Sequence, residues 1–151
     1  MYGSVQSRGY CASQPEAGEL AQQKRNLAYV KKLLIVDDSP VIRRSLRMLL
    51  EKRPDWEICG EAENGREGID KAILLCPDLI LLDLSMPVMN GFQAARELHR
   101  LLPKVPLLMF TSFGSAEIED EARASGITAV KSKSEDLESL CGSIQELLNA
   151  A

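Results

Sequence analysis

Short apolar runs and amphipathic stretches alternate five times along most of this chain, and this alternation constrains the fold more than any other feature. The apolar runs predict buried strands at residues 33–36, 56–62, 79–82, 105–110 and 127–130. Apolar residues at helical spacing predict helices near residues 42–50, 69–76, 92–102, 115–125 and 137–148. Alternating strands and helices with continuously apolar strands predict a parallel sheet covered on both faces, which is a doubly wound α/β fold.

Capping residues support these boundaries. Ser39 offers a hydroxyl directly before Pro40, and proline suits the first position of a helix. Asn64 and Gly65 mark the turn into the second helix. Ser134 is expected to cap the last helix, because acidic residues that favour a helix N-terminus follow it.

Residues 1–31 lack the alternation, and we expect a flexible N-terminal segment there, with a short helix at residues 19–28 as the alternative. Residues 32–151 then form one domain. Residues 1–32 hold five basic and two acidic side chains, whereas the remainder holds thirteen basic and twenty acidic ones. An acidic domain argues against direct binding of nucleic acid.

Targeting and cysteine signals are weak. No apolar run is long enough to cross a membrane, and the N-terminus lacks the features of a signal peptide, so a cytoplasmic location is expected. The four cysteines lack the spacing of a metal site. We expect Cys59, Cys76 and Cys141 to be small core residues. The basic run Arg43, Arg44 and Arg47 is interpreted as a solvated helix face.

Polar residues follow the predicted strands at one edge of the sheet, where doubly wound folds bind ligands. Asp37 and Asp38 end the first strand, Asp83 the third and Thr111 the fourth, and a lysine pair follows the fifth. Three carboxylates repel one another unless a cation compensates, and Mg²⁺ with oxygen ligands suits such a site. A lysine and a hydroxyl opposite can hold phosphoryl oxygens, and aspartate is a known nucleophile in phosphoryl transfer.

Four parts of the sequence resemble the receiver domains of two-component response regulators. They are residues 33–39, residues 78–91 around Asp83, residues 106–111 and Lys133. The resemblance runs from about Lys32 to Ala150. It implies a flavodoxin-like (βα)5 sheet with five parallel strands in the order 2-1-3-4-5, and a switch that accepts a phosphoryl group.

Carried over by position, the resemblance makes Asp83 the phosphoacceptor. It implies that Thr111 bonds a phosphoryl oxygen and that Lys133 pairs with the phosphoryl group. The residues that it implies for Mg²⁺ are Asp37, Asp38, Asp83 and the backbone carbonyl of Ser85.

Two positions depart from the family pattern: Ser134 follows the lysine where the family often has proline, and Val130 lies on the fifth strand. Lys131 competes with Lys133, but Gly126 matches a glycine seven positions before the family lysine and selects Lys133. Val130 stands where many receivers carry an aromatic residue that rotates inward on phosphorylation, which argues against an aromatic switch. The fourth helix is the least apolar, and weakly buried elements shift most easily, so we expect the responsive surface on the fourth helix, the fifth strand and the last helix. Phe113 is expected to shield the phosphoryl group from water.

The resemblance also implies partners. A sensor histidine kinase or a phosphotransfer protein would donate the phosphoryl group, and a protein target or a missing output domain would receive the signal. Phosphorylation-dependent homodimers remain open. The chain would assist its own phosphorylation and dephosphorylation without being a turnover enzyme. The alternative is an interaction module that works without phosphorylation, whereas the lack of GxxxxGK[ST] and GxGxxG motifs disfavours a nucleotide enzyme.

Overall fold

The computed structural model describes residues 16–18, 30–113 and 116–151 of the chain. The predicted helix at residues 19–28 and most of the predicted flexible segment lie outside the described residues. The division into a segment and a domain therefore stays a prediction.

Five parallel strands form one sheet in the order β2-β1-β3-β4-β5, which confirms the predicted topology. The strands are β1 (Lys31–Val36), β2 (Trp56–Ala62), β3 (Leu79–Leu82), β4 (Leu107–Thr111) and β5 (Ala129–Ser132). The helices are α2 (Pro40–Leu50), α3 (Gly65–Leu75), α4 (Gly91–Leu101), α5 (Ala116–Ala124) and α6 (Leu137–Ala150).

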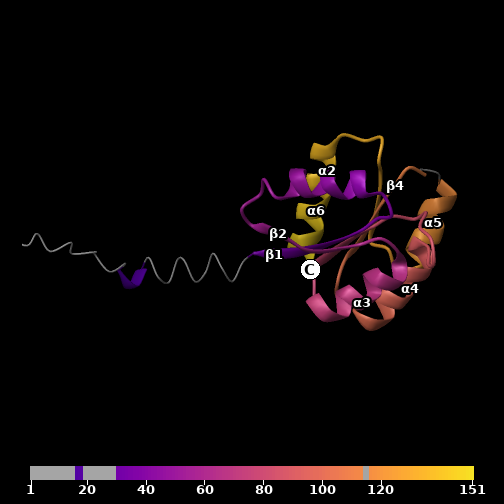
Figure 1. Cartoon of the computed structure of the whole chain (residues 1–151), viewed down its shortest axis with the longest axis horizontal. Coiled ribbons are helices and arrows are strands. Elements are labelled where there is room, and N and C mark those ends of the chain that lie inside the picture. Colours follow the sequence, from indigo (N-terminus) through magenta and orange to yellow (C-terminus); the bar gives the residue numbers. More distant parts are fainter. Residues whose placement is uncertain (1–15, 19–29, 114–115) are drawn as a thin grey trace, which may run out of the picture.

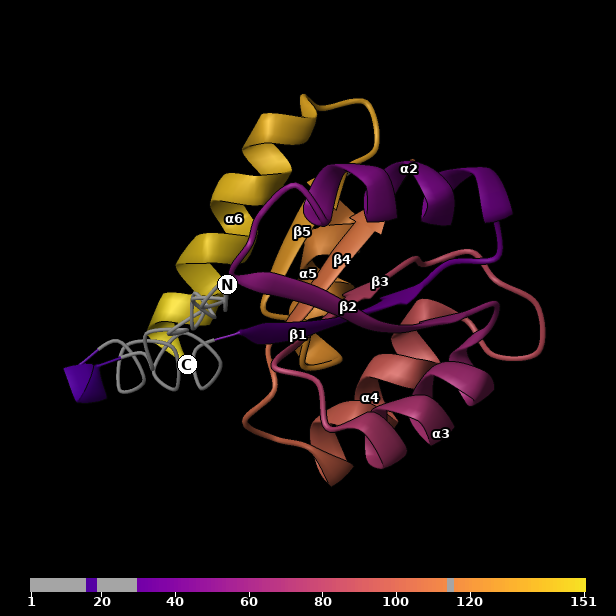
Figure 2. The same ribbon diagram turned by 60° about the vertical axis from the view of Figure 1, so that its left-hand side comes forward.

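The helices cover both faces of the sheet, as the doubly wound prediction requires (Figures 1 and 2). On one face, α2 and α6 pack over a core that includes Leu33, Ile35 and Leu81. On the other, α3, α4 and α5 pack over Leu34 and Leu82. Successive residues of β1 and β3 therefore enter opposite cores, which explains why these strands are continuously apolar.

The register of the central strands brings the chain to the same edge. Val36 is paired with Leu82, so Asp37 and Asp83 both follow directly after paired residues. The backbone N–H of Asp83 donates to the carbonyl of Val36 at 2.9 Å, and that of Asp37 donates to the carbonyl of Ala62 at 3.0 Å. The site predicted at this edge thus begins on three hydrogen-bonded strands.

One predicted cap is confirmed and one is wrong. The side chain of Ser39 accepts from a backbone N–H in the first turn of α2. Asn64, predicted only to mark a turn, caps α3 in the same way. The cap of α6 is Asp136, not Ser134, and it accepts from the N–H of Glu138 at 2.9 Å. Ser134 lies in the preceding turn, where its N–H donates to the hydroxyl of Ser132.

The fifth strand starts two residues later than predicted. Gly126 has φ +88°, and the N–H of Ile127 donates to the carbonyl of Ala122 at 3.0 Å. The left-handed glycine and this hydrogen bond together cap the C-terminus of α5. Ile127 therefore serves the helix end, and β5 begins at Ala129.

One cysteine was also placed wrongly. Cys76 is exposed because it ends α3 in the left-handed conformation with φ 49°, outside the core. Cys59 and Cys141 are half-buried. None of the helices in the described ranges has the length and apolar content that crossing a membrane requires.

Candidate functional site

Three carboxylates meet at the carboxyl edge of the sheet. Asp37, Asp38 and Asp83 each present an oxygen, and these oxygens all lie within 4.8 Å of one another. Asp37 is 2% exposed and Asp83 is 6% exposed, whereas Asp38 is open to solvent. The cluster therefore has two buried carboxylates and one at its mouth.

Lys133 lies against the two buried carboxylates. Its Nζ is 2.7 Å from Oδ2 of Asp37 and 3.4 Å from Oδ2 of Asp83. Its backbone N–H donates to the carbonyl of Thr111 at 2.8 Å, which fixes the loop after β5 beside β4. Lys131, by contrast, has its Nζ 3.5 Å from Oε2 of Glu135. The structure thus brings Lys133 to the carboxylates and points Lys131 elsewhere.

The charges of this cluster perturb one another. Burial raises the pKa of Asp83, and the negative charge of Asp37 raises it further, although Lys133 and the N–H of Leu84 oppose the shift. Burial alone would lower the pKa of Lys133. Its hydrogen bond to Asp37 and the charges of Asp37 and Asp83 outweigh that effect, so the pKa of Lys133 is raised. The single positive charge of Lys133 therefore offsets only part of the negative charge of the carboxylate cluster.

A small hard cation fits this donor set. The carboxylates are oxygen ligands of the kind that Mg²⁺ prefers, and Asp38 leaves the cluster open to solvent, from which waters would complete the coordination of a bound ion. One oxygen of each buried carboxylate is already held by a backbone N–H at 2.8 Å, from Ser39 to Asp37 and from Leu84 to Asp83. Hydrogen bonds from neighbouring groups to a metal-binding carboxylate fix the orientation of that carboxylate.

The remaining predicted site residues lie at or after the carboxyl ends of β3 and β4, at the same edge of the sheet. Thr111 is fully buried, and its Oγ1 accepts from the N–H of Phe113 at 3.3 Å. Phe113 is 52% exposed at the same edge. Ser85 is exposed, two residues beyond Asp83 in the loop before α4.

The loop before α4 is tightly held. Val88 has φ 68°, a conformation that a β-branched residue rarely adopts, and the N–H of Met89 donates to the carbonyl of Pro87 at 2.7 Å. A Cβ added to Gly91 would collide with the backbone carbonyl of Asp83. The close packing of Gly91 on Asp83 explains why glycine starts α4.

Sequence reasoning missed Arg43. Within the basic run interpreted as solvated, Arg44 is exposed, but the side chain of Arg43 is only 13% exposed. Its Nη1 donates to the carbonyl of Asp37 at 2.6 Å, and its Nε lies 3.3 Å from Oε1 of Glu61. The signal was in the spacing, because Arg43 and Arg47 are four residues apart and share a helix stripe that can face β2.

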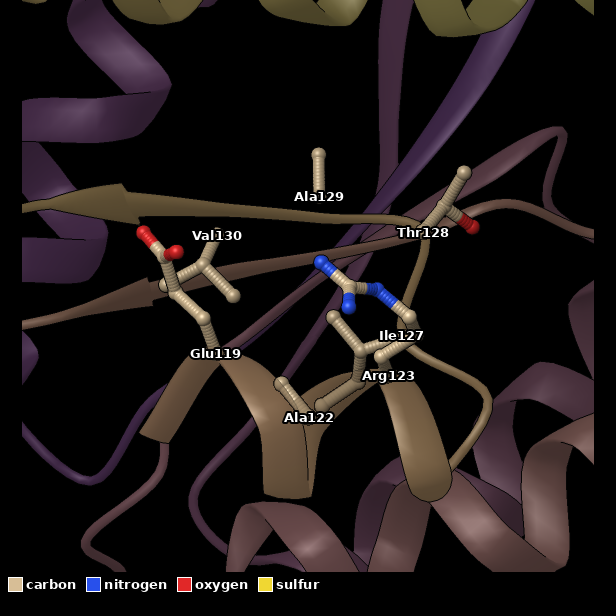
Figure 3. A pocket seen from close by; sticks show the side chains of 7 residues that line it. All are labelled: Glu119, Ala122, Arg123, Ile127, Thr128, Ala129 and Val130. Carbon is tan, nitrogen blue, oxygen red and sulfur yellow. The ribbon is translucent and has the colours of Figure 1, made fainter. Parts of the chain in front are cut away.

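The surface predicted to respond contains a hollow between α5 and β5 (Figure 3). Its volume is about 110 Å³, and Glu119, Ala122 and Arg123 line it from α5 while Val130 lines it from β5. None of the carboxylates of the acidic cluster lines it. Ala122 is the one buried residue among the described positions of α5, in keeping with the low apolar content of its sequence.

Comparison with known proteins agrees with this geometry. The family model described as the response regulator receiver domain matches residues 33–145. A protein-glutamate methylesterase/protein-glutamine glutaminase of Carboxydothermus hydrogenoformans is 38% identical over 122 residues, which are 80% of this chain and 36% of that protein. The transcriptional regulatory protein LnrK of Bacillus subtilis is 37% identical over 95 residues, which are 63% of this chain and 43% of that protein.

A solved structure, the response regulator domain of Thermotoga maritima CheB, is similar with a TM-score of 0.74 and 30% identity, covering 80% of this chain and 97% of that one. This chain spans well under half the length of either curated relative. The similarity to those two proteins therefore concerns the part of each that this chain matches.

Proposed function

Because this chain belongs to the response regulator receiver domain family of two-component signalling, we propose that Asp83 accepts a phosphoryl group and that the chain signals through the α5–β5–α6 surface. The observation that carries the proposal is the position of Asp83. Its carboxylate is buried, lies beside Asp37 and Asp38, and has Lys133 3.4 Å away.

The transfer needs a donor with a labile phosphoryl group, such as a phosphohistidine of a kinase or phosphotransfer protein. An oxygen of Asp83 attacks the phosphorus, forming an oxygen–phosphorus bond. The phosphorus–nitrogen bond of the donor breaks, and its electron pair leaves with the imidazole nitrogen, which takes up a proton. Magnesium supplies positive charge that offsets the repulsion between the incoming phosphoryl oxygens and the carboxylates.

The residues of this chain divide the remaining tasks. Asp37 and Asp38 hold the cation, together with the backbone carbonyl of Ser85. Lys133 shifts from the carboxylates to a phosphoryl oxygen, which is a stronger acceptor site once the new negative charge has formed. The hydroxyl of Thr111 bonds another phosphoryl oxygen and links the event to β4.

The α5–β5–α6 surface is the place where this event can alter partner binding. Helix α5 buries little, and weakly buried elements shift at low free-energy cost. Val130 cannot swing a ring, so we propose that movement of α5 over the hollow, rather than an aromatic rotation, changes this surface. The receiver of the signal is a separate protein, a second copy of the chain, or an output domain like those of the longer relatives.

A second candidate function is an interaction module that works without phosphorylation. Val130 favours it, because the aromatic residue expected for the usual switch is missing. The buried cluster counts against it, since buried like charges are costly and are rarely kept without a role.

The first experiment incubates the whole protein with Mg²⁺ and acetyl phosphate and weighs it intact, beside Asp83→Asn. The proposal expects a gain of about 80 Da, the mass of one phosphoryl group, in the wild type alone and only with Mg²⁺. A blank is repeated with a phosphorylated kinase, because a receiver can reject a small donor. If both donors fail while Mg²⁺ binds, the interaction module becomes the better reading.

A further inference from the structure

We propose that Arg43 is a positioning residue for the cation site: it holds the peptide group between Asp37 and Asp38 and so orients the carboxylate of Asp38. The inference rests on the proposed function, because it assigns Asp38 to the cation. It adds a residue that the resemblance did not supply and that the sequence alone placed in solvent.

The first step is the geometry of Arg43 itself. Its Nη1 donates to the backbone carbonyl of Asp37 at 2.6 Å, a short charge-assisted bond. Its other side is held by acids of β2 and the following turn, with Nε 3.3 Å from Glu61 and Nη2 3.9 Å from Glu63. A guanidinium presents its donors in one rigid plane, so it can fix an acceptor on one side from an anchor on the other.

The second step is what that carbonyl controls. The carbonyl of Asp37 belongs to the peptide group that leads into Asp38, and this plane sets the direction in which Asp38 leaves the backbone. The amide of Asp37 is fixed by Ala62, and its carboxylate by Ser39 and Lys133. The bond from Arg43 holds the carbonyl side of the same residue. Asp38 itself is exposed, so it depends on its backbone for orientation.

The third step is the expected consequence for binding. A flexible carboxylate loses conformational entropy when it binds a cation, whereas a held one has already lost it. Partners that orient a metal ligand typically change metal affinity about 10- to 100-fold when they are removed. Arg43 should therefore act on cation affinity rather than on the chemical step at saturating cation.

Arg47 provides a matched control. It lies one helical turn further along α2 and also pairs with Glu61, with Nη2 2.8 Å from Oε2. Its Nη1 lies 2.7 Å from Oε1 of Glu51, which directly follows α2 and is further along the chain from Asp37 and Asp38. Replacing Arg47 removes an ion pair with the same glutamate but leaves the bond between Arg43 and the carbonyl of Asp37.

The test compares the full chain with Arg43→Met and Arg47→Met. Isothermal titration with Mg²⁺ should show an affinity about tenfold weaker or worse for Arg43→Met, and within about twofold of wild type for Arg47→Met. Melting in EDTA monitors the purely structural effect, which both variants share. Acetyl phosphate labelling against Mg²⁺ concentration should show a higher half-saturating concentration for Arg43→Met, with a near-normal rate at saturation.

Equal Mg²⁺ affinities in the two variants would overturn the inference and leave Arg43 with a structural role only. If Arg43→Met does not fold, Arg43→Lys replaces it, since a single ammonium nitrogen cannot bridge Glu61 and the carbonyl of Asp37 as the planar guanidinium does; an affinity equal to wild type would then overturn the inference. If the wild type binds Mg²⁺ more tightly than Arg43→Met but accepts no phosphoryl group, the result refutes the proposed function alone. A wild type that binds no Mg²⁺ would refute both.

Discussion

The acidic edge of the sheet and the α5–β5 surface lie on one domain but are held in opposite ways. At the edge, Asp37, Asp83 and Thr111 are buried, and backbone N–H groups and Lys133 fix the carboxylates. On the surface, α5 buries little more than Ala122 and leaves a hollow against β5. The comparison indicates that packing is concentrated where charges need fixed positions, and that a region able to move needs little of it.

The largest effect is expected from breaking the acidic edge with Lys133→Met. This change leaves two buried carboxylates without their ammonium partner and removes the donor proposed for the phosphoryl group. Removing one such preorganised donor typically slows a reaction about 10²- to 10³-fold. The measurement is the rate of acetyl phosphate labelling at saturating Mg²⁺.

The control for this prediction is Lys131→Met, which removes the same charge two residues earlier, in β5. Its partners are Glu135 and Ser139, so labelling should stay within about twofold of wild type, as for a solvent-side ion pair of little worth. Equal loss of rate in both variants would show that net charge, rather than the position of Lys133, governs the site.

Gly91→Ala should disturb the edge through the backbone. The added Cβ would collide with the carbonyl of Asp83, so the loop must shift, at a cost of about 1–3 kcal/mol. Gly142→Ala on α6 is the control, because its Cβ meets open space and alanine favours a helix by about 0.5–1 kcal/mol. Urea unfolding compares the two. If Gly91→Ala were as stable as the wild type, the acidic edge would be less rigid than its contacts indicate.

The same contrast explains what sequence reasoning could reach. The strands followed from continuous apolar runs, and the carboxyl-edge residues followed from strand ends, because both depend on local pattern and on a general rule for parallel sheets. The order of the strands came from the family resemblance instead. The start of β5 could not be predicted in this way. Ile127 is apolar enough for a strand, but its backbone N–H bonds to the C-terminal end of α5.

The contacts of individual side chains also could not be predicted from the sequence. Arg43 and Arg44 are the same residue type, yet Arg43 reaches Asp37 and Arg44 faces solvent. The spacing of Arg43 and Arg47 indicates a shared helix face, but only the packing of α2 on β2 decides what that face contacts. Asp136 and Ser134 are both good caps, and the turn bonds of Ser134 decide between them. Tertiary contacts therefore set what local propensity leaves open.

The charge cluster also predicts a dependence on pH. The pKa of Asp83 is raised in the folded state, so folding gains from this group below its unfolded pKa and loses that gain as pH rises through the folded pKa. At pH 7 and without cation, ionised Asp83 is therefore a net cost. Asp83→Asn should raise stability in EDTA at pH 7 by roughly 0.5–2 kcal/mol, as a single change at a buried charge can.

Two conditions sharpen that prediction. The difference between Asp83→Asn and wild type should shrink as pH falls through the raised pKa of Asp83, because the wild-type carboxylate then also becomes neutral. Millimolar Mg²⁺ should shrink it as well, because the wild type gains more from the cation. Thermal melting of both proteins over this range provides the measurement. A less stable Asp83→Asn protein at pH 7 would mean that the pair with Lys133 outweighs burial.

The smallest effect is expected where packing is loosest. Val130→Phe enlarges a side chain beside a hollow of about 110 Å³, so the change in unfolding free energy should stay within about 0.5 kcal/mol. The same substitution at Val36 faces Gly68, whose added Cβ would lie 2.9 Å from the valine methyls, and should cost about 1–3 kcal/mol. Urea unfolding measures both. If Val130→Phe proved as costly as Val36→Phe, α5 would be as firmly packed as the core and could not serve as the element that moves.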